Sequence, residues 1–132
     1  MKRIAFITTN KILAQSLEAT VKTMVNMQFE FFLLLNFHQV LLDVEILEID
    51  VALIDMALFD AESISKQDGE SLFTLCEKIH KKLPNCRLLL LVSQENQQNR
   101  AIASKAKRKQ FVDDFLFYDA SLKYLIAKLT SL

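Results

Sequence analysis

The sequence has only one glycine and one proline among its 132 residues. Phosphate-binding loops and dinucleotide-binding turns need several closely spaced glycines, because the backbone must approach the phosphates. The single glycine, Gly69, therefore excludes a P-loop or a dinucleotide-binding motif. Proteins that bind nucleotides through such loops are thus not candidates.

Net charge and long apolar runs are absent too. Sixteen basic and sixteen acidic residues cancel, so there is no general attraction to nucleic acid or to an anionic membrane. No apolar run is long enough to span a bilayer, and we expect no signal peptide at the start of the sequence. Cys76 and Cys86 lack the spacing of metal ligands. We therefore expect two reduced thiols in a cytoplasmic protein.

Length and composition are those of one globular domain. The chain is 52% hydrophobic and 24% charged, which suffices for a buried core. Its length leaves little room for a second core. We predict a single domain that spans residues 1–132.

Apolar, β-rich segments alternate with amphipathic ones along the chain. This alternation predicts the α/β class: a doubly wound, five-stranded parallel sheet of flavodoxin-like order 2-1-3-4-5, with right-handed crossovers and five helices. The predicted strands cover 3–8, 29–35, 51–55, 87–93 and 115–118. The first predicted helix follows Asn10, whose side chain can cap it by accepting from the free N–H groups of the first turn, and extends to Met24. The second covers 37–47, and the other three carry apolar positions at 72–83, 102–106 and 122–129.

The third predicted strand ends on an acid. Val51 to Ile54 is uninterrupted and apolar, as in a strand buried on both faces. Asp55 follows directly. The carboxyl ends of strands in open α/β sheets form the crevice where ligands bind, so Asp55 is the first candidate site residue.

These features together resemble the receiver domain of two-component response regulators over the whole chain. The segment 50–55 looks like that family's third strand, with Asp55 at the phosphoacceptor position. Gly69 matches the glycine that precedes the third helix. The segment 114–117 looks like the fifth strand, with Phe115 at the switch aromatic position. The resemblance implies a role in signal transduction within a phosphorelay.

The metal-binding positions depart from the family. Receivers carry an acidic pair after the first strand that binds magnesium beside the phosphoacceptor, and here these positions are Thr8, Thr9 and Asn10. Magnesium requires charged oxygen ligands, and phosphoryl transfer depends on neutralising the moving group. We therefore expect a degenerate site with no metal, no cofactor and no catalytic residue.

The remaining positions depart as well. Tyr118 stands where the family has a lysine, and Val92 where it has the switch Thr or Ser. Ser93 follows one residue later, on the other face of a regular strand. We expect it to supply the missing hydroxyl only if that strand end is bulged. The connection from 55 to 69 is longer than in the family.

The function predicted first is docking to a protein partner, a histidine kinase or a downstream effector, without enzymatic activity. Asp55 is then a vestigial carboxylate, partly solvated and bonded to nearby N–H groups. A weak homodimer through 102–129 is expected, because this surface mixes lysines with acids. One alternative is a working receiver phosphorylated on Asp55 with magnesium. A second is a flavodoxin-like small-molecule sensor with its pocket over Asp55.

Charge is expected to divide across the sheet. The second helix is acidic, and the segment 100–109 carries five cations without an acid. We place them on different flanks of the sheet, where they could steer a protein partner. We do not expect a nucleic acid partner. His80 has no nucleophile nearby in sequence, and a plain helix-surface role is predicted for it.

Overall fold

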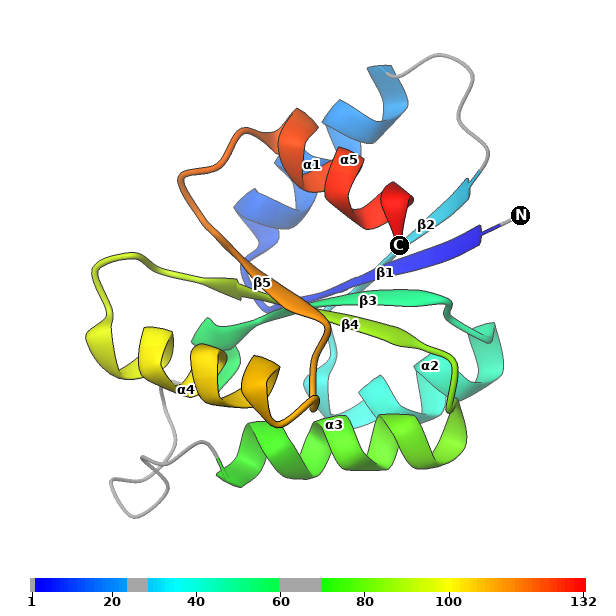
Figure 1. Ribbon diagram of the computed structural model, residues 1–132. Coiled ribbons are helices and arrows are strands. Elements are labelled where there is room, and N and C mark those ends of the chain that lie inside the picture. Colours follow the sequence, from blue (N-terminus) through cyan, green and yellow to red (C-terminus); the bar gives the residue numbers. More distant parts are fainter. Residues whose placement is uncertain (1, 24–28, 60–69) are drawn as a thin grey trace.

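A computed structural model describes residues 2–23, 29–59 and 70–132. It contains a five-stranded sheet in the order β2-β1-β3-β4-β5 (Figure 1). The strands are β1 (Lys2–Ile7), β2 (Phe29–Leu34), β3 (Val51–Asp55), β4 (Arg87–Val92) and β5 (Asp114–Phe117). The helices are α1 (Lys11–Thr23), α2 (Val40–Leu47), α3 (Glu70–Lys82), α4 (Gln97–Arg108) and α5 (Leu122–Ser131).

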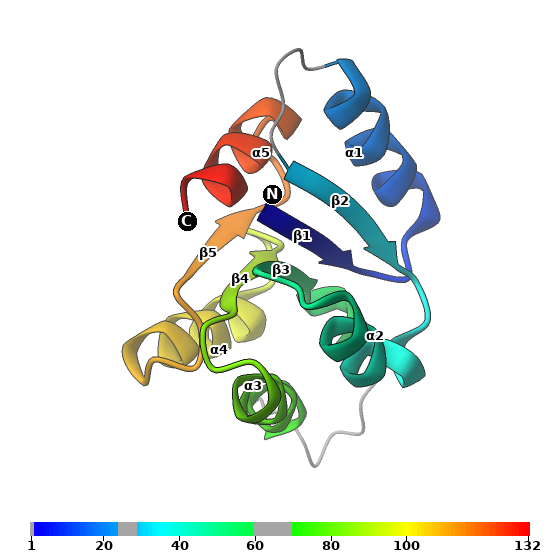
Figure 2. The same ribbon diagram turned by 90° about the vertical axis from the view of Figure 1, so that its right-hand side faces the viewer.

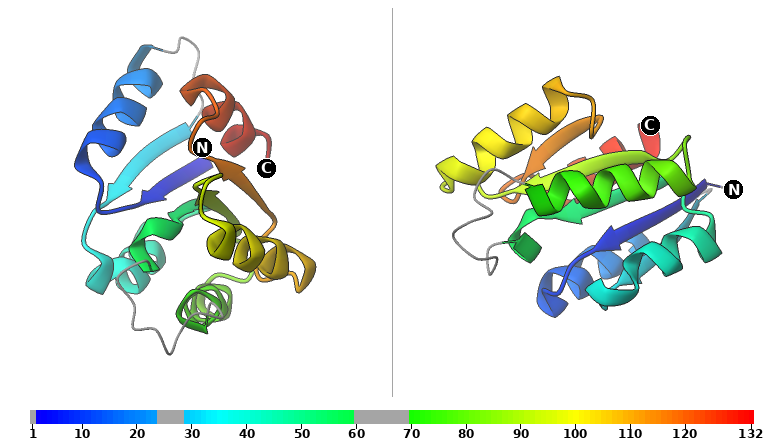
Figure 3. Two further views of the ribbon diagram at one scale, coloured as in Figure 1. Left: turned by 90° about the vertical axis from the view of Figure 1, so that its left-hand side faces the viewer. Right: turned by 90° about the horizontal axis from the view of Figure 1, so that it is seen from below.

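The predicted fold class is confirmed. All strand pairs are parallel. Helices α1 and α5 cover one face of the sheet, and α2, α3 and α4 cover the other (Figure 2 and Figure 3). Among the described residues, no helix is both long and apolar enough to cross a membrane.

Strand β3 lies at the centre and is buried at every residue. Ala52 and Ile54 pack into the core under α2, α3 and α4. Val51 and Leu53 pack into the core under α1 and α5. Burial of a large apolar side chain stabilises a fold by about 1.5–3 kcal/mol, so a strand that is apolar on both faces is favoured in the interior of the sheet, where helices cover both of its faces.

Several boundaries differ slightly from the predictions. The second helix starts with a 3-10 turn, Phe37–Gln39, where the Asn36 side chain accepts from the His38 amide. The predicted cap of α1 is confirmed, because the Leu13 amide donates to Asn10 Oδ1 at 3.0 Å. Met24 and Gly69 lie outside the described residues.

The predicted separation of charge is wrong in one respect. Acidic α2 and basic α4 cover the same face of the sheet, with α3 between them (Figure 2). The connections through α2, α3 and α4 each lead to a strand nearer β5, whereas the connection through α1 leads from β1 to β2, in the opposite direction. Right-handed connections that lead in the same direction place their helices on the same face of the sheet. In addition, Lys82 of α3 pairs with Glu45 of α2 at 2.8 Å, which neutralises part of the acidic surface.

The scarcity of glycine leaves a strained helix end. Glu48 follows α2 with φ 52°, in the left-handed region. The Ile49 amide bonds Val44 O at 3.1 Å, the geometry that glycine usually supports.

We expect Glu48→Gly to raise the free energy of unfolding by about 0.5–1 kcal/mol, because relief of left-handed strain exceeds the entropy that glycine adds to the unfolded chain. Urea unfolding measures the gain. Glu48→Ala retains Cβ and is the matched control; an equal gain in that variant would contradict the role of strain.

Candidate functional site

The site lies at the carboxyl edge of the sheet, where β1 and β3 end side by side. Asp55 is the last residue of β3. Thr8 directly follows β1, whose Ile7 pairs with Ile54. The register therefore places Thr8 next to Asp55, and side-chain alternation directs both toward the face covered by α1 and α5.

The Asp55 carboxylate accepts hydrogen bonds at both oxygens. The Thr8 hydroxyl donates to Oδ2 at 2.7 Å, and the Ala57 amide donates to Oδ1 at 3.0 Å. Thr8 Oγ1 in turn accepts from the Asn10 amide at 3.0 Å. The predicted bonding to nearby N–H groups is thus present at Ala57.

The expectation that Asp55 is partly solvated is wrong. Asp55 is 2% exposed and Thr8 is 1% exposed. Thr8 covers the carboxylate because it directly follows β1, which ends beside the end of β3 in the sheet. Thr9 and Asn10, by contrast, are exposed. Of the three acid-pair positions, only Thr8 bonds the Asp55 side chain among the hydrogen bonds described.

The side chains at this site do not suit a magnesium ion. The ion needs several oxygen ligands, and carboxylates supply most of the charge. Thr8 and Ala57, the described residues that bond Asp55, bring no charge, and each donates to one of its two oxygens. Across the described ranges, no group of three His, Cys, Asp or Glu side chains has metal-binding geometry.

The two switch candidates on β4 divide between the faces. Val92 is fully buried in the core under α2, α3 and α4, away from the face of Asp55. Ser93 directly follows the strand and continues the alternation of Leu89 and Leu91, which pack toward α1 and α5. Because Leu91 pairs with Asp55, regular alternation gives Ser93 the parity of the Asp55 face, so the bulge on which the expectation for Ser93 depended is not required. Its hydroxyl accepts from the Glu95 amide at 3.3 Å.

The aromatic positions on β5 also divide. Phe115 packs toward α4, with the Lys107 ammonium 6.0 Å from its ring centre. Tyr118 follows β5 and packs against the core under α1 and α5, the face to which Asp55 belongs. Its phenol stands in place of a cation, so this position adds no positive charge to the site.

Charges near α4 are paired within the chain. Asp114 contacts Lys107 at 3.0 Å and Lys128 at 3.1 Å. Burial opposes ionisation of Asp114, but hydrogen bonds from Lys107, the Phe115 amide and Lys128 outweigh it and lower its pKa below the ordinary 3.8. Part of the surface at 102–129 is therefore already neutralised.

The cysteines are free, in agreement with the predicted reduced thiols. Burial raises the pKa of each, Cys76 and Cys86, to about 12. A thiol is a nucleophile or metal ligand only as the thiolate. Neither cysteine is therefore a candidate catalytic group.

Sequence reasoning identified the position of Thr8 but not its role. It registered the loss of a charge and overlooked the hydroxyl that replaces it as a donor to Asp55. The sequence shows that a threonine directly follows a buried strand, but the register that sets it beside Asp55 comes from the structure.

No family model matches this sequence. No curated protein matches it.

Solved structures share its fold at low sequence identity. A response regulator receiver domain protein from Methanospirillum hungatei has a TM-score of 0.72 at 18% identity, covering 99% of this chain and 92% of that one. A Burkholderia pseudomallei response regulator with a phosphorylated aspartic acid has a TM-score of 0.70 at 18% identity, covering 98% and 66%. An adenylate cyclase structure from Rhodopirellula baltica has a TM-score of 0.74 at 17% identity, covering 98% and 85%.

Proposed function

We propose that this chain, which has the fold of response regulator receiver domains, is a signalling domain that acts by docking to a protein and carries a degenerate phosphorylation site. The observation that supports this proposal is the buried hydrogen bond from Thr8 to Asp55. It occupies an oxygen that a phosphoacceptor would need free. The proposal assigns the domain no enzymatic activity and no cofactor.

Phosphorylation of Asp55 would break stabilising interactions of its carboxylate and form few new ones. A hydrogen bond to a charged group contributes about 1.5–3 kcal/mol, and the attacking oxygen would have to give one up. The site would also need to open, since Asp55 is 2% exposed. Thr8 and Tyr118 bring no charge to offset that of the added phosphoryl group.

The test is incubation with acetyl phosphate and magnesium, followed by intact mass measurement. We expect no mass increase, and beryllofluoride should leave the amide spectrum unchanged. The control is Asp55→Asn, treated in parallel. A covalent phosphoryl adduct present in the native chain and absent from Asp55→Asn would establish the alternative of a working receiver.

We assign the partner to the protein class, as a histidine kinase or a downstream effector, and the location to the cytoplasm. Two features support a protein partner. Net charge is zero, which gives no general attraction to nucleic acid. The outer surface of α2 exposes Leu42 and Ile46, spaced four residues apart, at 57% and 65%; such apolar surface is typical of protein contacts.

A weak homodimer through 102–129 remains a prediction, and the ion pairs within the chain indicate how weak. Asp114 already bonds Lys107 and Lys128, so these groups offer little to a second copy. We expect sedimentation to show dimers only at high protein concentration and low salt. Dimers that persist at high salt would contradict pairing by charge.

A sensor with its pocket over Asp55 receives no support from the cavities described. A shallow cavity of about 550 Å³ at the carboxyl edge is lined by Ser93, Glu95, Asn96 and Gln97. Asp55 is not part of this lining. The buried carboxylate is therefore not the floor of that cavity.

A further inference from the structure

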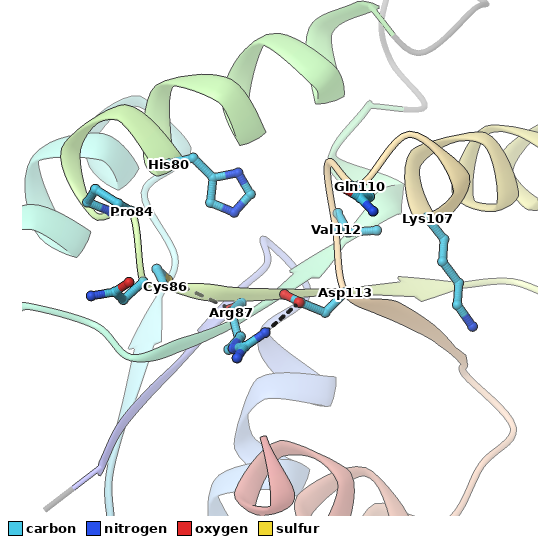
Figure 4. A pocket seen from close by; sticks show the side chains of 9 residues that line it. His80, Pro84, Cys86, Arg87, Lys107, Gln110, Val112 and Asp113 are labelled. Carbon is cyan, nitrogen blue, oxygen red and sulfur yellow. Dashed lines mark hydrogen bonds and ion pairs between the residues drawn. The ribbon is translucent and has the colours of Figure 1, made fainter.

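A cavity of about 770 Å³ lies at the amino edge of the sheet, between the last turns of α3 and α4 (Figure 4). His80 points from α3 toward the loop that carries Gln110. Arg87 instead has the parity of Leu89, on the face covered by α1 and α5, and it pairs with Asp113 at 3.1 Å. The polar side chains of the lining therefore do not converge on one position, and this cavity is not a candidate binding site.

The two edges of the sheet differ in how they are protected. In the described part of the chain, β2 and β5 each have only one neighbouring strand. An edge strand presents a row of backbone N–H and C=O groups that can pair with another chain, and natural proteins often place charged side chains there to prevent it. The side chains of β2 and β5 therefore indicate which edge is open.

The β5 edge carries charge. Asp114, the first residue of β5, contacts Lys107 of α4 at 3.0 Å and Lys128 of α5 at 3.1 Å. Helices α4 and α5 lie on opposite faces of the sheet beside β5 (Figure 2), so the two lysines approach Asp114 from both sides of the strand. A strand added to β5 would have to displace or desolvate these charges, which is costly.

The β2 edge has little such protection. Glu30 is the one charged residue of this strand. It lies opposite Arg3 of β1 in the register and contacts it at 3.7 Å, so its charge is offset within the chain. The half-buried apolar residues of β2 are Phe29, Phe31, Phe32 and Leu33. An apolar edge strand of this kind is a site at which another strand can add.

The backbone of β2 directs alternate residues outward. The Thr8 amide donates to Leu34 O at 3.3 Å, so the backbone groups of Leu34 point toward β1. Because backbone groups alternate in direction along a strand, every second residue before Leu34 also points toward β1. The residues whose N–H and C=O groups point outward are Phe29, Phe31 and Leu33. This row is symmetric about Phe31.

That symmetry suits pairing of β2 with the same strand of a second copy. A two-fold axis brings identical surfaces together and makes the two strands antiparallel. With Phe31 opposite Phe31 of the second copy, Phe29 of each chain lies opposite Leu33 of the other. All outward residues are then matched, and each such pair exchanges two bonds, which gives about six backbone hydrogen bonds.

The neighbouring antiparallel registers are poorer. Pairing centred on Glu30 sets the two Glu30 carboxylates directly opposite each other, and like charges in that position are destabilising. Pairing centred on Phe32 sets Phe29 beyond the end of β2 in the second copy, so its bonds are lost. Pairing centred on Phe31 instead sets aromatic and aliphatic side chains opposite one another, and such cross-strand pairs are stabilising.

We propose that two copies of this chain associate through the outer edge of β2, in antiparallel pairing centred on Phe31, so that one sheet continues through both. The net charge of zero means that the copies do not repel each other as a whole. Because charge protects β5, the assembly closes at two copies instead of extending into a fibre. This interface is separate from 102–129, and it is independent of the proposed docking function.

Amide hydrogen exchange in the native chain tests the proposal without any substitution. Pairing should protect the outward amides of Phe29, Phe31 and Leu33, whereas the amides that point toward β1 are bonded in either state. We expect exchange of the outward amides to slow at least about threefold between about 20 μM and about 1 mM protein. Exchange of the inward amides should not change. No slowing, or equal slowing of both sets, overturns the proposal.

Sedimentation separates this interface from pairing by charge. In about 1 M sodium chloride the Debye length is about 3 Å, and dimers through β2 should persist there. Phe31→Lys and Phe31→Glu each set like charges opposite one another and should each weaken the dimer at least about tenfold. At low salt, a mixture of these two variants should form more dimer than either alone, because opposite charges then meet. The salt dependence expected for 102–129 is measured in Phe31→Lys, which cannot pair through β2.

Phe117→Lys is the matched control, since it places the same charge at a half-buried aromatic position of the other edge strand. It should change the dissociation constant of the dimer by less than about twofold. An equal loss in Phe117→Lys, or dimers that persist in both folded Phe31 variants, overturns the proposal. If substitution of Phe31 unfolds the chain, hydrogen exchange in the native chain still decides the outcome.

Discussion

Thr8→Asp should destabilise the magnesium-free protein by about 3–5 kcal/mol, the cost of an uncompensated buried charge. Thr8 is 1% exposed and its hydroxyl donates to Asp55. The substitution replaces that donor with a second carboxylate, so two negative charges share a buried site and the pKa of one is raised. A raised folded-state pKa means that the cost increases as pH rises above the unfolded value. Urea unfolding at two pH values measures both effects.

Thr8→Asn is the matched control, since its side chain has the size of aspartate, no charge and an N–H group that can donate to Asp55. We expect it to cost much less than Thr8→Asp. An equal cost in the two variants would show that shape, rather than charge, governs this position.

Magnesium should restore stability only where acids are restored. In the double variant Thr8→Asp, Thr9→Asp, three carboxylates including Asp55 come together, which is the charge that the ion requires. At about ten times its dissociation constant, the ion should add about 1.4 kcal/mol. The native chain should show no such gain, and a gain there would contradict the degenerate site.

Asp55→Ala should cost about 3 kcal/mol, whereas Asp55→Asn should change stability by less than about 1 kcal/mol. Alanine removes the acceptor of the Thr8 hydroxyl and the Ala57 amide, and leaves the hydroxyl of a buried residue without its acceptor. Asparagine keeps an oxygen for Ala57, and its amide can donate to Thr8 Oγ1. Partner binding should be unchanged in Asp55→Asn.

Thermal or urea unfolding of both variants beside the native chain provides the measurement. Thr8→Val removes the hydroxyl at nearly constant volume and completes a double-mutant cycle with Asp55→Asn. A negligible coupling between positions 8 and 55 would show that their hydrogen bond does not hold the site together.

The fold was predictable because its signals are local. Five apolar segments at regular spacing determine the strands, and right-handed connection then leaves few orders for a parallel sheet. The apolar run Val51–Ile54 is enough to identify the central strand, which is buried throughout. The cap at Asn10 was predictable for the same reason, since it depends on residues only three positions apart.

The details of the site depend on register, which the sequence does not specify. Burial of Asp55 follows from the level at which β1 ends beside β3. The relation of Ser93 to Asp55 follows from the pairing of Leu91 with Asp55. The cavity at His80 needs three segments that are distant in sequence, α3, β4 and the loop after α4. His80 itself lies on α3 and is partly exposed, which is compatible with the helix-surface role predicted for it.

The cover that α5 provides bears on how the protein is made. Leu125, Ile126 and Leu129 complete the core over Ile4 and Phe6 of β1, and the Lys2 ammonium bonds the Thr130 carbonyl at 3.0 Å. Because the chain is synthesised from its N-terminus, β1 is made early and α5 is made late. Until residues 122–131 emerge, α1 alone covers this face of the nascent sheet, and the part that α5 buries in the finished fold stays exposed. Molecular chaperones therefore have their longest opportunity to act on that face.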